Sequence, residues 1–132
     1  MVSGEAPAQP VGEVYDWYVR GLELLKARNP AAAAALLEHA VRAEPESRNL
    51  REALARAQFD SGRFASARDN FAAIVATSPT EDYAHFGLGL ASARLGDYDE
   101  AAEHLALAVA MRPDNKHYLT ALRHARAARD QA

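Results

Sequence analysis

The chain has five histidines, and these are its most versatile side chains for metal or acid–base chemistry: His39, His85, His104, His117 and His124. A zinc site on one helix needs two histidines four residues apart with a glutamate between them, and no pair has that arrangement. His117 and His124 are seven residues apart and would share a helical face, but no third ligand is evident. We therefore expect no metal site and no bound cofactor.

Nucleophilic and phosphate-binding chemistry has equally little support. The chain has no cysteine, and Ser61, Ser66, Ser78 and Ser92 have no evident His/Asp partners. Gly87-Leu88-Gly89 lies within a helical pattern rather than in a glycine-rich phosphate loop, so we read these glycines as packing positions. The prediction is a protein with no catalytic residues that is not an enzyme.

Composition restricts the partners. The hydrophobic fraction is 49%, the charged fraction 25% and the net charge −3, which is typical of a soluble globular protein without a positive field for nucleic acid or anionic lipid. Neither a secretory leader nor an apolar run of membrane-spanning length is present. We expect a cytoplasmic protein with no nucleic acid and no membrane among its partners.

Short breaks divide the chain into helical segments. Residues 1–12 have no apolar periodicity and are predicted to form a flexible N-terminal tail. Asn29 followed by Pro30 marks a helix start, because asparagine caps the free N–H groups and proline lacks one. The breaks predict helices near residues 14–27, 30–43, 48–60, 64–77, 81–95, 98–111 and 115–130.

A 34-residue period runs through these segments. It relates four sets of residues: Pro45, Pro79 and Pro113; Gly21, Ala55 and Gly89; Ala33, Ala67 and Ala101; and Leu37, Phe71 and Leu105. Small residues at these positions let two helices approach closely, the bulky residues fill the space between repeats, and proline ends each repeat. Trp17 stands four residues before Gly21.

This pattern resembles the tetratricopeptide repeat family. The resemblance implies an all-α fold, a right-handed α-solenoid of three helix-turn-helix repeats at about 14–47, 48–81 and 82–115. A capping helix at about 115–130 would complete a domain of residues 13–132, with Arg123, Arg126 and Arg129 read as its solvated face. Several residues depart from the pattern and cast doubt on local packing: Arg20, Arg28, Arg51, Gln58, His85 and Ser92.

The resemblance also implies a concave groove, lined by the first helix of each repeat, that grips a peptide or a partner helix. The groove residues carried over by register are Tyr15, Tyr18, Leu22, Asn49, Glu52, Arg56, Tyr83, Phe86, Leu90 and Arg94, together with Leu25, Phe59, Asp60, His117, Thr120 and His124. The aromatic members favour a partner site, because exposed apolar concavities usually mark one. The alternative is that some of these rings belong to the core.

Two further readings concern charge. Arg56 stands in the middle of the groove and either contacts a ligand carboxylate or is neutralised by Glu52 and Asp60, each four residues away. Some family members bind chaperone tails through a carboxylate clamp, but the matching positions are Tyr18, Leu22, Ala53, Tyr83 and Gly87. The prediction is an adaptor or scaffold for a protein or peptide with apolar anchors. The alternative is a self-assembling homodimer that forms through the groove or the exposed first repeat.

Overall fold

The computed structural model describes residues 12–132, which fold into seven α-helices. They are α1 (Val14–Lys26), α2 (Pro30–Ala43), α3 (Arg48–Asp60), α4 (Phe64–Thr77), α5 (Asp82–Arg94), α6 (Tyr98–Met111) and α7 (Lys116–Gln131). Every helix begins and ends within one residue of the predicted bounds, and no strand occurs among the described residues. The predicted tail lies outside the described residues except for Gly12.

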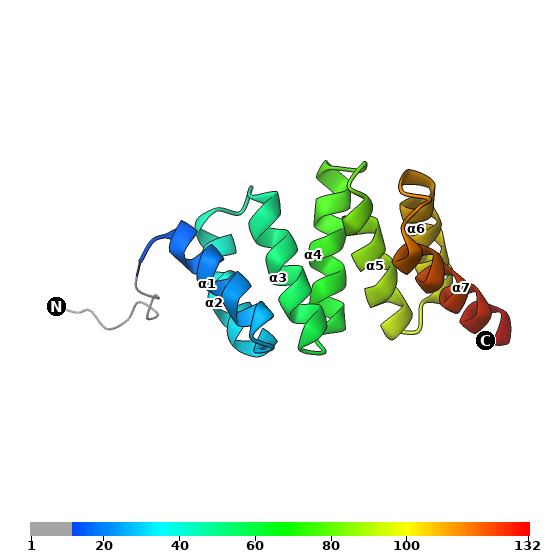
Figure 1. The fold of residues 1–132 in the computed structure, drawn as a ribbon, viewed down its shortest axis with the longest axis horizontal. Coiled ribbons are helices and arrows are strands. Elements are labelled where there is room, and N and C mark those ends of the chain that lie inside the picture. Colours follow the sequence, from blue (N-terminus) through cyan, green and yellow to red (C-terminus); the bar gives the residue numbers. More distant parts are fainter. Residues whose placement is uncertain (1–11) are drawn as a thin grey trace.

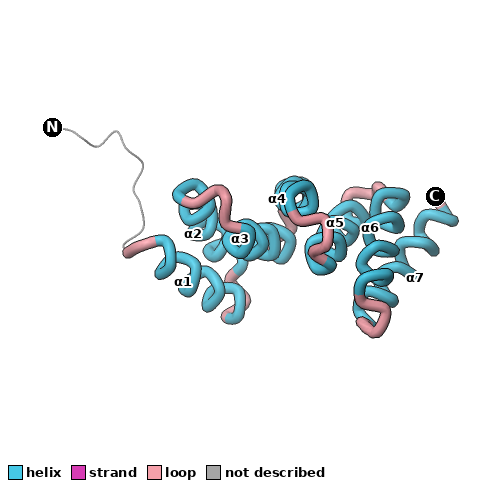
Figure 2. Tube along the Cα trace, turned by 90° about the horizontal axis from the view of Figure 1, so that it is seen from above, coloured by secondary structure: helices cyan, strands magenta, loops and turns pink. Residues whose placement is uncertain are grey.

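The helices form two layers. Figure 1 shows them side by side in chain order, and Figure 2 shows α1, α3, α5 and α7 along an inner arc with α2, α4 and α6 behind it. Each helix packs against its neighbours in the chain, and α1 also contacts α3, α3 contacts α5 and α5 contacts α7. The all-α solenoid fold is therefore confirmed, with the first helix of each repeat on the inner layer.

Local chemistry explains where the helices begin. The side chains of Asn29, Ser47, Asp97 and Asn115 each accept a hydrogen bond from the backbone N–H three residues later, at 3.2–3.4 Å. These bonds satisfy N–H groups that the first helical turn leaves without partners. They open α2, α3, α6 and α7.

The turn inside each repeat is the same in all three repeats. Gly62 and Gly96 have φ of 85° and 86°, and Arg28 occupies the equivalent position with φ of 62°. In each turn the next N–H bonds a carbonyl five residues earlier, at 2.8–2.9 Å, which closes the helix end. The turn at Arg28 therefore has the same conformation as the turns at Gly62 and Gly96. Replacement of glycine by arginine strains the backbone but does not change the loop.

The core follows the repeat columns. Leu37, Phe71 and Leu105 are at most 2% exposed, and Ala33, Ala67 and Ala101 are fully buried. A Cβ added to Gly21 would lie 2.7 Å from Leu37, and one added to Gly89 would lie 2.6 Å from Leu105. The small residues are therefore needed for close approach of the two helices of a repeat, as the period predicted.

Polar departures inside the stack are satisfied by one another. The Arg51 guanidinium donates to Asn70 Oδ1 at 2.8 Å and to the Pro45 carbonyl at 3.1 Å, and the Asn70 amide donates to Gln58 Oε1 at 2.7 Å. Ser92 donates to Glu100. At Arg51, Gln58 and Ser92 the polar residue that replaces a bulky one therefore has a polar partner on a neighbouring helix.

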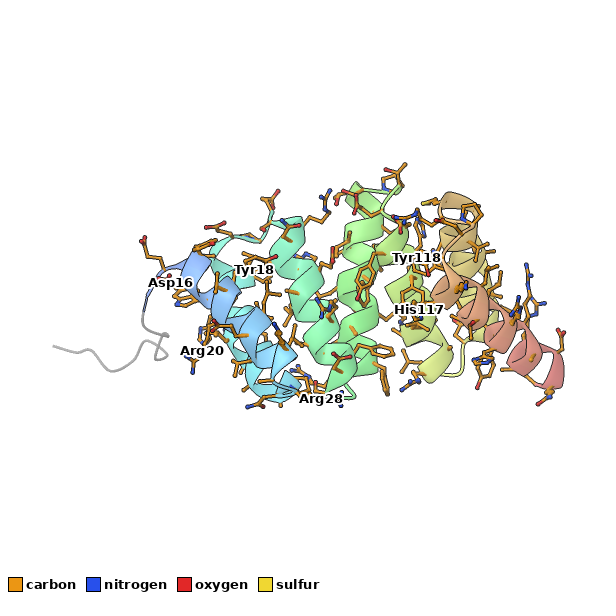
Figure 3. All side chains as sticks on the ribbon, in the orientation of Figure 1. Asp16, Tyr18, Arg20, Arg28, His117 and Tyr118 are labelled. Atoms are coloured by element: carbon orange, nitrogen blue, oxygen red, sulfur yellow. The ribbon has the colours of Figure 1, made fainter. Side chains whose placement is uncertain are left out.

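The two ends of the stack differ from its middle. In repeat two the helix face that packs on the preceding helix carries Leu50, Leu54 and Ala57, all buried, whereas α1 carries Asp16, Arg20 and Glu23 at the same positions, all exposed. Figure 3 shows Asp16 and Arg20 on the outer side of α1. At the other end, Arg123 takes the column of Gly21 and Gly89, where a further helix would need a small residue. Both outer faces are polar, as solenoid ends require.

Candidate functional site

The inner arc carries the ten predicted groove residues that come from α1, α3 and α5 and are named first in the sequence analysis. Three are exposed and seven are half-buried. The exposed ones are Tyr15, Asn49 and Arg94, and the half-buried ones are Tyr18, Leu22, Glu52, Arg56, Tyr83, Phe86 and Leu90. Leu25 was wrongly included among the groove-facing residues: it is 9% exposed and packs with Leu37 and Leu54 in the first core cluster.

Aromatic rings connect the groove to the core. The distances between ring centroids are 6.2 Å from Phe71 in α4 to Tyr83, 6.1 Å from Tyr83 to Phe86, and 4.7 Å from Phe86 to Tyr118 in α7. Phe86 also packs on the core cluster around Leu105. Offset and tilted ring pairs at such distances stabilise the packing beyond area burial. This ladder crosses from α4 through α5 to α7.

Tyr18 and Phe86 are half-buried and also pack against core clusters, so part of their ring surface belongs to the core, as the alternative reading of these rings held. Tyr18 packs on two core clusters, one around Leu37 and one around Trp17. Register along one helix predicts which residues share a face, but side chains at the edge of that face reach both the groove and the neighbouring helix. Figure 3 shows Tyr18 on α1 and Tyr118 beside α5.

Arg94 is held against two rings. Its guanidinium carbon is 5.1 Å from the centroid of Phe59 and 5.2 Å from that of Phe64, and the two rings are themselves 5.1 Å apart in an edge contact. A guanidinium over an aromatic face is attracted by the ring quadrupole. Arg94, Phe59 and Phe64 therefore form a cation–aromatic cluster at the C-terminal ends of α3 and α5.

Two hollows open along this arc. One, of about 310 Å³, lies between the start of α1 and the start of α3, and its lining consists of Val14, Tyr15, Tyr18, Glu44, Ser47, Asn49 and Leu50. The other, of about 60 Å³, lies between α3 and α5 and is lined by Arg56, Phe59, Asp60, Phe71, Tyr83, Phe86, Gly87 and Leu90. Four of these ten groove residues, Arg56, Tyr83, Phe86 and Leu90, meet in this second hollow.

Gly87, which the sequence indicated as a packing position, lines this hollow, and its partner Phe71 was not predicted. A Cβ at Gly87 would lie 2.4–2.6 Å from the ring atoms of Phe71, so the ring reaches the hollow across the bare glycine. The signal was present in the columns: Phe71 is larger than Leu37 and Leu105, and Gly87 is smaller than Ala53 and Ala121. The larger residue and the smaller one are partners across the α4–α5 contact.

Charges around the hollow are mixed. Burial and then the charge of Glu81 raise the pKa of Glu52, and Arg56 opposes this shift. Burial also raises the pKa of Tyr83, whose hydroxyl lies in the field of Arg56, Glu52 and Asp60. No close ion pair joins Arg56 to Glu52 or Asp60 in the described part of the chain. Arg56 is therefore half-buried without a fixed carboxylate partner.

The contact between α5 and α7 contains a polar link. The Tyr118 hydroxyl donates to Asp82 Oδ2 at 2.7 Å, and Tyr118 is 5% exposed. Burial, followed by this hydrogen bond, raises the pKa of Tyr118 well above its usual value. The link fixes α7 at the edge of the groove.

Two histidines meet in the structure, but they are not the two that share a face of α7. His117 and His124 are both exposed, with no contact between them in residues 12–132. His85 Nδ1 instead lies 3.0 Å from His104 Nδ1, and His85 Nε2 lies 2.8 Å from the Pro79 carbonyl. Because a carbonyl only accepts, Nε2 of His85 carries a proton and, when the ring is neutral, its Nδ1 accepts from His104. Within the described residues no group of three His, Cys, Asp or Glu side chains is placed to hold a metal.

Sequence comparison agrees with the repeat pattern. The family model described as "Tetratricopeptide repeat" matches residues 18–82 and 52–116, and the chain belongs to this family. Mouse and human "Superkiller complex protein 3" are 33% and 31% identical to it over 107 residues, 81% of this chain. The chain spans about 7% of the length of these curated relatives.

Solved structures share the fold. "First TPR of Spaghetti (RPAP3) bound to HSP90 peptide SRMEEVD" superposes with a TM-score of 0.82 at 20% identity, covering 93% of this chain and 98% of that one. The first such domain of human RPAP3, solved by NMR, also gives 0.82 at 21% identity, with 89% and 93% covered. Among the described residues, no helix is long and apolar enough to cross a membrane.

Proposed function

We propose that this chain is a non-catalytic protein–protein interaction module that binds a peptide or a partner helix in the groove along α1, α3, α5 and α7. The observation that carries the proposal is the half-exposed aromatic surface of Tyr83 and Phe86 beside the half-buried guanidinium of Arg56. Apolar surface gains about 25 cal/mol per Å² on burial, so large side chains of a partner would supply most of the affinity. The partner has two or three spaced apolar anchors.

The peptide of the structural relative is not the ligand we propose. That peptide, SRMEEVD, carries adjacent acidic residues. The corresponding clamp positions of this chain hold Tyr18, Leu22, Ala53, Tyr83 and Gly87, none of which is cationic. Mixed charges around the groove instead favour binding that depends only weakly on salt.

Affinity capture from a native lysate tests the groove. Leu90→Asp places a charge in the hollow between α3 and α5, and Leu107→Asp places the same charge on α6, where Leu107 is 40% exposed. Partners retained by the parent and by Leu107→Asp but lost from Leu90→Asp support the proposal. Equal retention by all three proteins, with helicity preserved in circular dichroism, contradicts it.

Self-assembly through the first repeat is the second candidate. A hollow of about 670 Å³ opens at the outer side of α1, and its lining consists of Tyr15, Asp16, Trp17, Val19, Arg20, Glu23, Leu24 and Leu36. Its apolar floor favours a homodimer, whereas Asp16, Arg20 and Glu23 would have to be desolvated or paired on contact. Light scattering after size exclusion at several concentrations separates the candidates: a firm dimer favours self-assembly, and a monomer favours the groove.

A further inference from the structure

The hollow between α3 and α5 has the dimensions of one aliphatic side chain. Its volume is about 60 Å³. Because a water molecule needs roughly 10–15 Å³ of such space, the hollow has room for about four to six heavy atoms. That number matches a leucine, isoleucine or methionine side chain and is too small for phenylalanine or tryptophan.

The floor of this hollow is built differently from the matching places in the stack. The contact between α2 and α3 places Leu37 in one core cluster with Ala53, and the contact between α6 and α7 places Leu105 against Ala121. Only the contact between α4 and α5 pairs a phenylalanine with a glycine among the described residues. A Leu/Ala pair would fill the interior equally well by volume. The Phe71/Gly87 pair differs in placing an aromatic ring, 2% exposed, at the bottom of the hollow.

Charges of both signs surround the mouth of the hollow, and carboxylates exceed guanidinium groups by one when Arg94, which is held against the lining residue Phe59, is counted. Glu52, Arg56 and Asp60 follow one another at four-residue spacing along α3, and Arg56 and Asp60 line the hollow directly. Two carboxylates therefore accompany one guanidinium. Towards the start of α5, Glu81 and Asp82 add two more carboxylates, and Arg48 pairs with Glu81 at 3.4 Å. A positive residue next to an apolar anchor would complement this surface, and a negative one would be repelled.

We propose that the hollow formed by Phe71, Gly87 and Leu90 is a selective pocket for one Leu, Ile or Met side chain of an extended partner segment that carries Lys or Arg beside this anchor. The inference rests on the proposed groove function and names the chemistry that the groove selects. Phe71 and Gly87 determine specificity through the shape of the pocket floor. Arg56 and Asp60 lie at the mouth, within reach of the partner backbone and its flanking charge.

Titration of the isotope-labelled chain with synthetic peptides, followed by two-dimensional NMR, tests this pocket. The probes are nine-residue Gly/Ser peptides with a central Lys-Leu pair, and versions in which Leu is replaced by Met, Phe, Trp or Ala, or Lys by Glu. Burying one aliphatic side chain is expected to give the Leu and Met peptides about tenfold tighter binding than the Ala peptide. The amide signals of Tyr83, Gly87 and Leu90 should move most.

Two variants connect the preference to the pocket. Phe71→Leu combined with Gly87→Ala installs the Leu/Ala pair used elsewhere in the stack and should remove the preference for Leu over Ala with the fold intact. Leu90→Ala widens the hollow and should shift the preference from Leu to Phe, which keeps the test decisive if the first variant does not fold. Leu107→Ala, on α6, is the matched control and should bind as the parent does.

The outcomes separate the pocket from the groove. Tighter binding of the Phe or Trp peptide to the parent, or an unchanged preference in the folded repacked variant, overturns the aliphatic pocket. Equal binding of the Lys and Glu peptides overturns the charge assignment. Peptides that bind along α3 and α5 without any anchor preference overturn the pocket but leave the proposed groove function standing. No binding by any peptide overturns the pocket, and the lysate capture with Leu90→Asp then decides the groove function separately.

Discussion

Arg28 has the most costly backbone conformation among the described non-glycine residues. Its φ of 62° lies in the left-handed region, where a side chain costs about 1–2 kcal/mol. Gly62 and Gly96 adopt the same region without this cost, and a Cβ added to either would meet nothing within 4 Å. Crowding by neighbouring residues therefore plays no part at this turn position, and the penalty comes from the residue's own backbone conformation.

Arg28→Gly is expected to stabilise the protein. The relief of strain exceeds the extra entropy of glycine in the unfolded chain, which offsets about 0.5–1 kcal/mol of it. The expected net gain is about 0.5–1 kcal/mol, a rise of a few degrees in melting temperature. Gly62→Ala is the matched control and should lower the melting temperature. A lower melting temperature for Arg28→Gly would show that the arginine side chain contributes more than its strain removes.

The His85–His104 contact predicts how stability depends on pH. Burial, and then the charge of His85, lower the pKa of His104 below its ordinary 6.5. The unfolded chain therefore binds a proton at His104 more readily than the folded chain does. The stability that neutral His104 contributes to the fold is fully present above the unfolded pKa of about 6.5 and is lost as the pH falls. Full protonation of both rings would also place two N–H groups against each other across 3.0 Å.

Thermal unfolding at pH 8 and pH 5.5 tests this sign. The parent should melt at a lower temperature at pH 5.5, and His104→Asn, which copies Asn70 of the second repeat, should reduce the difference. Glu52 acts in the opposite direction, because its raised pKa favours folding as the pH falls, so the comparison must be between variants. His124→Asn, at an exposed position, is the control. An equal pH difference in the parent and in His104→Asn would contradict the assignment.

At the scale of the helix, the sequence predicted most of what is observed. Each bound was found within one residue because Asn29, Asp97 and the prolines act through local backbone chemistry. The small-residue columns also predicted the core. The packing of Phe71 against Gly87 was not predicted. The repeat register shows which positions face each other, but not which of two facing residues is large and which is small. The His85–His104 contact, whose members are 19 residues apart on two helices, was not predicted either.

The groove shows the same division. Placement of the ten site residues on α1, α3 and α5 followed from the register of the family resemblance, but their exposure did not. Tyr18 and Phe86 lie at the edge of the inner face, where a rotation of the side chain decides between groove and core. The spacing of residues along one helix therefore predicts which side chains share a face of that helix. The packing of adjacent helices then decides which of those rings remain accessible to a partner.

At the scale of the whole chain, deletion of residues 1–12 tests the boundary of the folded unit. The tail has no apolar periodicity, and the helices begin at Val14. Helicity and melting temperature should remain almost unchanged. Circular dichroism of the shortened chain checks this, with a deletion extended to residue 20, which removes Trp17, as the destabilised comparison. A clear loss of stability on removing 1–12 alone would mean that the tail docks on the stack.

Stability in this molecule depends on position along the stack. Helices contact only their near neighbours, so Phe71 in the central repeat couples both halves, while α7 touches only α5 and α6. Energies of such solenoids are approximately sums of repeat and interface terms. A substitution in the middle should therefore affect global unfolding, and one at the end should first release the end.

Phe71→Ala and Leu122→Ala test this difference with two buried side chains, 2% and 6% exposed. Phe71→Ala should cost about 3–5 kcal/mol and lower the melting temperature of all seven helices together. Leu122→Ala removes comparable apolar contact, but only between α7 and the cluster around Leu105, so opening of α7 alone relieves the damage. Amide hydrogen exchange should then show faster exchange in α7 with protection in α3 and α4 retained. Uniform loss of protection in Leu122→Ala would mean that the stack unfolds as one unit, and an unchanged melting temperature in Phe71→Ala would contradict the core assigned to α4.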